Sequence, residues 1–355
     1  MSFQKEIKII IILTVISIAL SFSSINGQSN IIITKENSHK LPKSTIDIID
    51  FDNVVVKNKE QIQIINISDS NNYKIIYDFI LPRNKKYHSF QNGRFIILDE
   101  GHGNDFYESV YDVVTKQLIN LQESDGSTGA VRIAQKDGAI LYNILHTSKI
   151  NDKKYGKILS QRKYVKLKPR IGESKIIADS TMGSLWCPNE EWFFGSKLVR
   201  REGRKVISER VLVNRNGLKV VLPSEESKIS GAVWSADGNY LAIPQYSTLT
   251  IYEIKWNDNL PVVESYLKKS SYSAPILFSP DSNYIIYTKY YEDGEAVSGD
   301  DIMLTDAKLS FTKPIIEHKD KIEIPIYWTK EGLITQDDMT AGSSLNIYKY
   351  QIKYK

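Results

Sequence analysis

The chain has 355 residues, of which 25% are charged and 41% are hydrophobic, and this composition is that of an ordinary globular protein. The formal net charge of +4 is too small to indicate nucleic-acid binding, which requires a concentrated basic surface. The single cysteine, Cys187, excludes a disulfide within the chain, and the 21 tyrosines favour β-strands. The composition therefore predicts a β-rich protein that is stabilised by its core.

The N-terminal residues 1–27 are expected to direct export. Lys5 and Lys8 precede an apolar run from Ile9 to Phe22, and small and polar residues follow this run. A membrane-spanning helix needs about 20 apolar residues, so the shorter run favours a cleaved signal peptide. The alternative is an uncleaved membrane anchor through residues 9–22. The protein is accordingly expected to be periplasmic, secreted or at the cell surface.

One pattern recurs seven times along the rest of the chain. Each copy reads as an entering strand, a turn, a hydrophobic strand and a strand that alternates polar with apolar residues. The clearest copies are WSADGNYLAI at 234–243 and FSPDSNYIIY at 278–287. The spacings between successive turns run from 40 to 52 residues, and the turns are centred on Asp52, Asn92, Asp137, Asn189, Asp237, Asp281 and Glu331.

This repeat predicts the fold. Four short strands in each unit of about 45 residues are typical of an all-β β-propeller, here with seven blades of four antiparallel strands, although six or eight blades also fit. The propeller is expected to span residues 46–355. The last unit ends soon after its third strand. The N-terminal segment 28–45 is therefore expected to supply the missing outer strand, through Ile31–Glu36, and to close the ring.

The two clearest copies resemble the TolB-type, WD40-like propeller repeat, whose core reads roughly W-S-P-D-G before a hydrophobic strand. The matching residues are Trp234, Ser235, Asp237 and Gly238 in one copy and Phe278, Ser279, Pro280 and Asp281 in the other. The resemblance implies a propeller, and relatives with this fold include exported scaffolds and the propellers of prolyl-oligopeptidase-like enzymes. The G-x-S-x-G nucleophile turn of those enzymes is absent from this sequence, and fold alone does not transfer function.

Four polar segments are expected to be loops between second and third strands, and such loops gather on one face of a propeller. The segments are 99–105, 146–156, 290–301 and 337–344. Their acidic and histidine side chains form the predicted binding surface, which consists of Asp99, Glu100, His102, Asp105, His146, Glu292, Asp293, Asp300, Asp301, Asp337 and Asp338.

Neither a cofactor nor a metal is predicted from these loops, because no single loop has the spacing of a calcium-binding loop. Oxygen ligands from several loops could nevertheless hold Ca²⁺, and Asp99 and Asp105 with His102 could hold a transition metal. No catalytic residue is predicted, since none of the five histidines lies in a motif with a nucleophile.

The favoured function is an exported binding or scaffolding module for a protein or an envelope glycan. Contact with a membrane is expected only if the N-terminal segment stays uncleaved. The alternative is an enzyme that acts on a glycan or a peptide in the central channel. An enzyme is expected to bring acids, histidine or a metal within a few ångströms of one another inside that channel, whereas a scaffold is not.

Buried roles are expected for the most conspicuous aromatic and sulfur side chains. Trp186, Trp234 and Trp328 stand at the same place in three copies, which favours packing between blades over a surface for stacking sugars. Cys187 follows a tryptophan in a strand-like segment, so a buried and unreactive thiol is predicted.

Overall fold

The computed structural model describes residues 31–354 apart from short segments, namely 70–71, 102–105, 122–125, 153–155, 203–204, 224–231, 246–247, 271–272, 294–295, 319–321 and 338–344. The expected signal peptide or anchor therefore lies outside the described residues. All regular structure in the described part of the chain is β-strand. No helix that could span a membrane occurs there.

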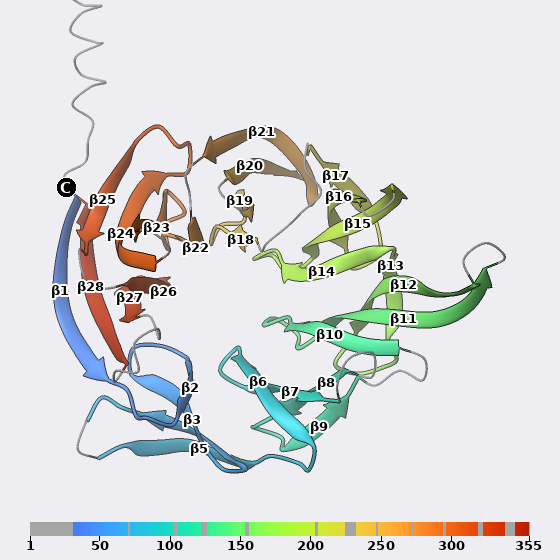
Figure 1. Ribbon diagram of the computed structural model, residues 1–355, viewed down its shortest axis with the longest axis horizontal. Helices are drawn as coiled ribbons and strands as arrows, with labels where there is room; N and C mark the ends of the chain where they lie inside the picture. The colour runs from blue at the N-terminus through green and yellow to red at the C-terminus, as the bar shows by residue number, and fades with distance from the viewer. Residues whose placement is uncertain are drawn as a thin grey trace, which may run out of the picture.

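Seven four-stranded antiparallel sheets stand in a ring, and the first strand of each blade lies nearest the centre (Figure 1). The first blade contains β2 (Thr45–Ile48), β3 (Asn53–Asn58), β4 (Gln61–Asn66) and β5 (Lys74–Ile80). The second contains β6 (Lys85–Gln91), β7 (Phe95–Glu100), β8 (Tyr107–Asp112) and β9 (Gln117–Asn120). The third contains β10 (Gly126–Ile133), β11 (Ile140–Asp152), β12 (Gly156–Lys168) and β13 (Lys175–Asp179).

The remaining blades follow in chain order. The fourth contains β14 (Thr181–Trp186), β15 (Trp192–Glu202), β16 (Lys205–Asn214) and β17 (Lys219–Leu222). The fifth contains β18 (Val233–Trp234), β19 (Tyr240–Gln245), β20 (Thr248–Asn257) and β21 (Leu260–Ser270). The sixth contains β22 (Ser273–Phe278), β23 (Tyr284–Asp293), β24 (Ala296–Asp306) and β25 (Thr312–Glu317). The predicted seven-bladed propeller is therefore confirmed once the last blade is added.

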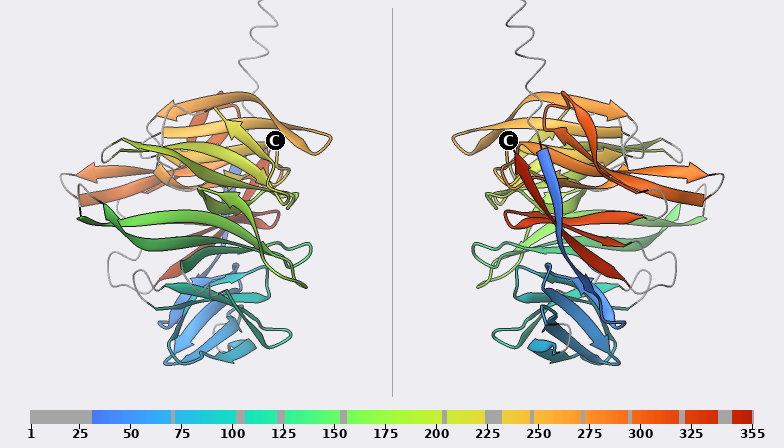
Figure 2. Two further views of the ribbon diagram at one scale, coloured as in Figure 1. Left: turned by 90° about the vertical axis from the view of Figure 1, so that its right-hand side faces the viewer. Right: turned by 90° about the vertical axis from the view of Figure 1, so that its left-hand side faces the viewer.

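The seventh blade joins the two ends of the described chain. It contains β26 (Glu323–Thr329), β27 (Gly332–Asp337), β28 (Asn346–Tyr354) and, as its outermost strand, β1 (Ile31–Lys40). β1 runs antiparallel to β28, with Ile31 opposite Tyr354 and Lys40 opposite Asn346, and the two strands lie side by side in the side views (Figure 2). The segment expected to close the ring lies within β1, which completes the last blade and joins the two ends of the described chain in one sheet.

The repeated turn follows the first strand of every blade and is held by the same hydrogen bonds in the two clearest copies. Ser235 Oγ donates to Asp237 Oδ1 at 2.6 Å and accepts from the Tyr240 backbone N–H at 2.9 Å. The turn at Ser279 repeats both hydrogen bonds at 2.5 and 2.9 Å. The aspartate of the repeat therefore holds a turn.

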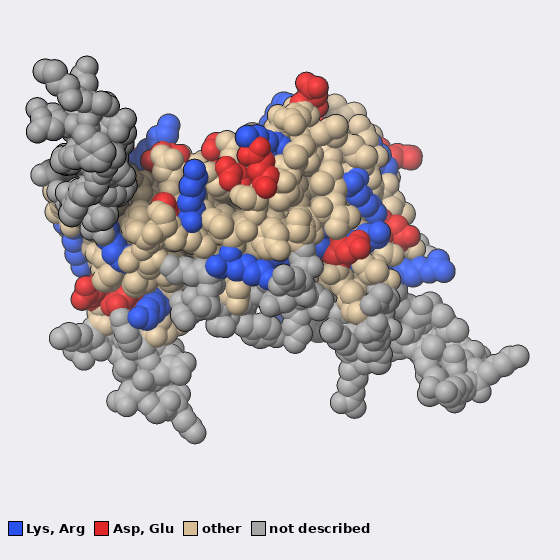
Figure 3. Space-filling view, turned by 90° about the horizontal axis from the view of Figure 1, so that it is seen from above, with Lys and Arg blue, Asp and Glu red and all other residues tan. Residues whose placement is uncertain are grey.

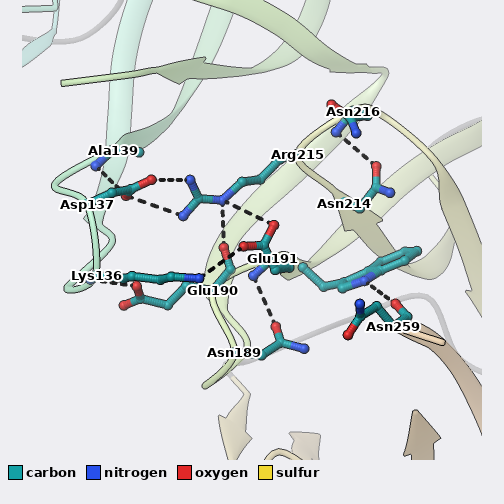
Figure 4. Close-up of polar contacts among 11 residues, drawn as sticks. Lys136, Asp137, Ala139, Asn189, Glu190, Glu191, Asn214, Arg215, Asn216 and Asn259 are labelled. Atoms are coloured by element: carbon teal, nitrogen blue, oxygen red, sulfur yellow. Dashed lines mark hydrogen bonds and ion pairs between the residues drawn. The ribbon is translucent and has the colours of Figure 1, made fainter. Parts of the chain in front are cut away.

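The same turns also connect neighbouring blades. Arg215, between β16 and β17, forms an ion pair with Asp137 of the third blade (Figure 4). Arg215 Nε donates to the Glu190 carbonyl at 2.7 Å, and the Glu190 carboxylate accepts from the Lys136 backbone N–H, also at 2.7 Å. These contacts join the third and fourth blades at one face of the ring.

Apolar side chains fill the spaces between the blades. Trp192, Trp234 and Tyr252 belong to one cluster that the fourth and fifth blades share. Trp186 and Trp328 are partly buried and pack against two other clusters. The packing role expected for Trp186, Trp234 and Trp328 is thus confirmed.

Two of the expected loops are long strand hairpins instead. β11 and β12 pair continuously from Ile140 opposite Lys168 to Asp152 opposite Gly156, and β23 and β24 pair as far as Asp293 opposite Ala296. The prediction of loops at 146–156 and 290–301 is therefore wrong over these paired residues, because a polar sequence does not by itself end a strand. The neighbouring strand satisfies the backbone groups whatever the side chains are, so a polar sequence can stay paired.

Acidic and basic side chains are mixed on the outer edge of the ring. On the described part of the edge seen in Figure 3, Lys and Arg side chains alternate with Asp and Glu side chains. This mixture of charges agrees with the small net charge of the chain.

Candidate functional site

The first predicted loop places two acidic residues at the end of β7. Asp99 Oδ2 lies 3.1 Å from His88 Nδ1, and Glu100 forms a salt bridge of 2.7 Å with Lys85 Nζ. His102 and Asp105 lie outside the described residues. Both described acids of this loop therefore contact ionisable side chains of β6.

The other predicted residues do not form one exposed acidic surface. Asp300 and Asp301 lie within β24 and are 0% and 8% exposed, because that segment is a paired strand. His146 is half-buried in β11, with its ring edge-on to Tyr164. Asp337 accepts hydrogen bonds from Asn346 Nδ2 at 2.8 Å and from the Tyr348 hydroxyl at 3.0 Å. The side chains of Glu292 and Asp293 in β23, and residue Asp338, are outside the description.

A cavity of about 790 Å³ lies in the central channel. The first strands of the second, third, fourth and seventh blades all contribute to its wall, and the lining residues include His88, Gln91, Arg132, Leu185, Trp186 and Tyr327. Its lining is therefore mixed polar and aromatic, in contrast to the acidic surface that the loops predicted.

Three ionisable groups from three consecutive strands meet beside this cavity, and one of them, His88, lines it. His88 occupies a bulge in β6, Asp99 is the last residue but one of β7, and Glu108 lies opposite Asp99 on β8. One imidazole nitrogen and one oxygen of each carboxylate all lie within 4.8 Å of one another. The histidine side chain is 44% exposed and that of Asp99 is 22% exposed, whereas Glu108 is buried. We call this group the channel cluster.

Glu108 is held in place by the neighbouring blade. Its Oε2 accepts a hydrogen bond of 2.8 Å from the Val131 backbone N–H, and its own backbone N–H donates to Thr128 Oγ1 at 2.9 Å. Burial raises the pKa of the Glu108 carboxyl, and the hydrogen bond from Val131 only partly opposes this rise. Glu108 therefore keeps its proton to a higher pH than an exposed glutamate does.

Arg132 provides the positive charge of the cavity. Its side chain is exposed and lines the cavity, and Nη1 donates to the Val131 carbonyl at 2.7 Å. The surrounding protein lowers the pKa of Arg132, and the nearby Glu108 only partly opposes this. Among the described residues, Arg132 has no carboxylate at salt-bridge distance. The cavity thus presents an incompletely compensated cation.

A second cluster joins the sixth and seventh blades. His318 Nδ1 lies 3.2 Å from Asp300 Oδ1, and His318 Nε2 lies 3.2 Å from Glu323 Oε2. Thr335 Oγ1 donates to the other oxygen of Glu323, and burial raises the pKa of Asp300. Both carboxylate side chains are 0% exposed. We call this group the interblade cluster.

The sequence reasoning named Asp99 but missed His88, Glu108 and Arg132. Asp99 and Glu108 face each other through strand register, and His88 is brought near by the bulge in β6. The one signal in the sequence for this site is His88, a histidine in the first strand of a repeat, where the channel wall is expected.

No family model matches the chain, and no curated protein matches it. Among solved structures, an oligogalacturonate lyase in complex with manganese is similar over 90% of this chain and 98% of its own, with a TM-score of 0.51 and 9% identity. An oligogalacturonate lyase from Vibrio parahaemolyticus covers 91% and 98%, with a TM-score of 0.50 and 10% identity. A TolB-like protein from Agrobacterium tumefaciens covers 81% and 95%, with a TM-score of 0.40 and 12% identity. At these identities the likeness shows the fold alone, and the chain is a seven-bladed β-propeller.

Proposed function

We propose that the protein is an exported binding propeller that takes a carboxylate-bearing partner into its central channel, with Arg132 as the anchoring cation. The observation that carries this proposal is the Arg132 guanidinium in the wall of the 790 Å³ cavity, without a salt bridge to the described residues. A guanidinium binds a carboxylate through two parallel hydrogen bonds, so an exposed guanidinium on the cavity wall is suited to an anionic partner.

The exposed part of the channel cluster and the end of β7 belong to the same proposed contact surface. His88 supplies a further hydrogen-bonding group in the cavity, and Glu100 lies beside Asp99 at the end of the strand. Export is part of the proposal and depends on residues 1–27. The N-terminal residue of the protein isolated from its native host tests it, because a cleaved signal leaves a start near residue 28.

Binding of carboxylated chains to the full-length protein tests the role of Arg132. Two carboxylated chains serve as probes, oligogalacturonate and poly-L-glutamate. Oligogalacturonate is chosen because two of the similar solved structures are oligogalacturonate lyases. The uncharged counterparts of the two probes are the methyl-esterified sugar and poly-L-glutamine. We expect wild-type protein to prefer a charged chain over its uncharged counterpart, and Arg132→Gln to weaken this binding about 10–100-fold, as expected for a charge-assisted contact of roughly 1.5–3 kcal/mol.

Arg170→Gln is the matched control, because Arg170 is an exposed arginine of the same blade, in the turn between β12 and β13. It changes the net charge equally and is expected to leave binding unchanged. The proposal is wrong if wild-type protein binds neither charged chain, or if Arg132→Gln and Arg170→Gln behave alike.

A second candidate function is an enzyme that acts on such a chain, and the channel cluster favours it. Two carboxyl groups in different surroundings can divide acid and base roles, with buried Glu108 as the proton donor and the more exposed Asp99 as the base. Chromatography of the two probes after incubation with the protein measures whether they are cleaved. Products with wild-type protein but not with Glu108→Gln support the enzyme, and an unchanged probe with wild-type protein excludes it for these chains while leaving the binding function intact.

A further inference from the structure

We propose that His88, Asp99 and Glu108 hold a divalent first-row metal ion, Mn²⁺ or Zn²⁺, on the wall of the channel. The ion would take one imidazole nitrogen and two carboxylate oxygens from three neighbouring strands of one blade. Of the three residues, His88 also lines the cavity, so a molecule in the cavity could reach an ion bound to its ring.

The positions of the three ligand groups follow from paired strands. Asp99 and Glu108 are directly opposite on β7 and β8, and their side chains therefore lie on the same face of the sheet. The bulge at His88 changes the register of β6 between Tyr87 and Ser89. Since the three candidate ligand atoms already lie within 4.8 Å of one another, small side-chain rotations bring them to the separations found around a bound metal.

An unsatisfied oxygen in the cluster provides a second and independent observation. Asp99 Oδ1 is buried and has no hydrogen-bond partner among the described residues, while Oδ2 of the same carboxylate contacts His88. A buried polar atom of this kind is costly unless something satisfies it. A bound cation provides the missing interaction.

The charges around the cluster also favour a cation. Asp99 and Glu108 contribute two carboxylates, one of them fully enclosed by protein. Two described cations lie near them: Arg132 interacts electrostatically with Glu108, and Lys86 is opposite Asp99 in β6. Neither forms a salt bridge with the cluster within the described part of the chain, so a divalent ion can balance both acids.

The ligand types indicate which ions fit. Imidazole nitrogen suits zinc and other first-row transition metals, and carboxylate oxygen suits manganese as well as magnesium and calcium. One nitrogen with two carboxylates therefore favours Mn²⁺ or Zn²⁺ over Ca²⁺, which takes six to eight oxygen ligands. Three protein ligands with open positions are the arrangement of metal sites that bind a further molecule.

The interblade cluster has the same residue types but cannot form such a site. Its imidazole lies between the two acids and uses a different nitrogen for each, Nδ1 for Asp300 and Nε2 for Glu323. A single ion cannot replace both contacts, because the two ring nitrogens point in different directions. The contrast shows that convergence on one point, rather than residue composition, distinguishes the channel cluster.

This metal site does not depend on the binding function proposed for Arg132. The open positions deepen that function, because they could take an oxygen of the same anionic partner, and this part rests on the proposed function. A test with the metal alone separates the two proposals, since it uses no carboxylated chain.

The test uses the full-length protein after removal of metals with a chelator. Mn²⁺ is titrated and followed by electron paramagnetic resonance, and Zn²⁺ is titrated by calorimetry. We expect one ion per chain, and a splitting from a coordinated nitrogen in the Mn²⁺ signal. His88→Gln is expected to remove that splitting and to weaken binding by more than the roughly 10–100-fold that loss of an outer-shell partner costs.

Two controls keep the test decisive. His146→Gln removes another described histidine and is expected to leave metal binding unchanged. Thermal unfolding without metal shows whether each variant is folded, and added Mn²⁺ or Zn²⁺ should raise the unfolding temperature of wild-type protein but not that of His88→Gln. The proposal is overturned if neither ion binds to wild-type protein, or if His88→Gln binds as tightly as wild-type protein does.

Discussion

The channel cluster and the interblade cluster contain the same kinds of group, one histidine and two carboxylates, in very different surroundings. His88 is 44% exposed and faces a cavity, whereas His318 is 11% exposed and lies between two carboxylates that solvent does not reach. Each cluster leaves one buried aspartate oxygen, Asp99 Oδ1 or Asp300 Oδ2, without a hydrogen bond among the described residues, and the interblade cluster links strands of two blades. The accessible groups of the channel cluster are suited to binding, and the enclosed groups of the interblade cluster are suited to holding the ring together.

This difference shows that the acidic residues predicted to form one loop surface do not share one role. Asp99 and Asp300 were both assigned to one polar loop surface. The structure places Asp99 beside His88, which lines the channel cavity, and Asp300 inside β24, where its oxygen accepts from the Glu323 backbone N–H at 3.1 Å. The two aspartates therefore have different surroundings, because the side chain of Asp99 is 22% exposed and that of Asp300 is enclosed between two blades.

Removal of the interblade histidine should have the largest effect on stability. In His318→Ala, two buried carboxylates lose their common partner, and we expect the free energy of unfolding to fall by about 3–5 kcal/mol. The matched change in the channel cluster, His88→Ala, should cost less than about 1 kcal/mol, because its ion pair is exposed. Urea denaturation of both variants measures the difference. Equal losses would contradict the division into a structural and a functional cluster.

The ion pair between Asp112 and Arg94, an arginine that stays charged at all pH values of interest, extends the comparison to the pH dependence of stability. Arg94 donates to Asp112 from Nε at 2.8 Å and from Nη2 at 2.5 Å, and these bonds hold the pKa of Asp112 well below its usual range. A lowered pKa stabilises the fold above the ordinary aspartate value, and this stabilisation disappears as the pH falls through the lowered pKa.

We therefore expect Asp112→Asn to lose about 1–3 kcal/mol near neutral pH, and the difference from wild-type protein to shrink as the pH falls below about 3.8. Urea midpoints of both proteins across the acid range give the result. Arg94→Gln should show the same trend, since it removes the other half of the pair. A difference that stays constant over the acid range would show that the charge of Asp112 is not what stabilises the fold.

The fold could be predicted because its signals are local and repeated. The turn at Asp237 and the turn at Asp281 use the same hydrogen bonds, so one short pattern marks the start of each unit. The hairpin of β11 and β12 could not be predicted from the same signals, because the polar sequence at 146–156 has the composition of a loop although its backbone is paired.

The channel cluster could be predicted only in part. Asp99 was visible as an acid after a hydrophobic strand, but its approach to Glu108 depends on strand register and its approach to His88 depends on a bulge. Arg132 reaches the cavity from the next blade, across a break in regular pairing between Gly129 and Arg132. A pattern read along the chain does not contain these cross-strand relations.

The smallest effect is expected at Cys187, a residue that lines the same cavity as His88 but belongs to the packed wall. Its side chain is 1% exposed, and burial raises the pKa of the thiol to about 12. The thiolate is the reactive form, so folded protein should not react with a thiol-specific reagent under conditions that label the unfolded chain completely. A histidine-specific reagent should meanwhile modify His88 and spare His318. Rapid labelling of Cys187 in folded protein would show that the channel wall opens, and access could then no longer separate the two clusters.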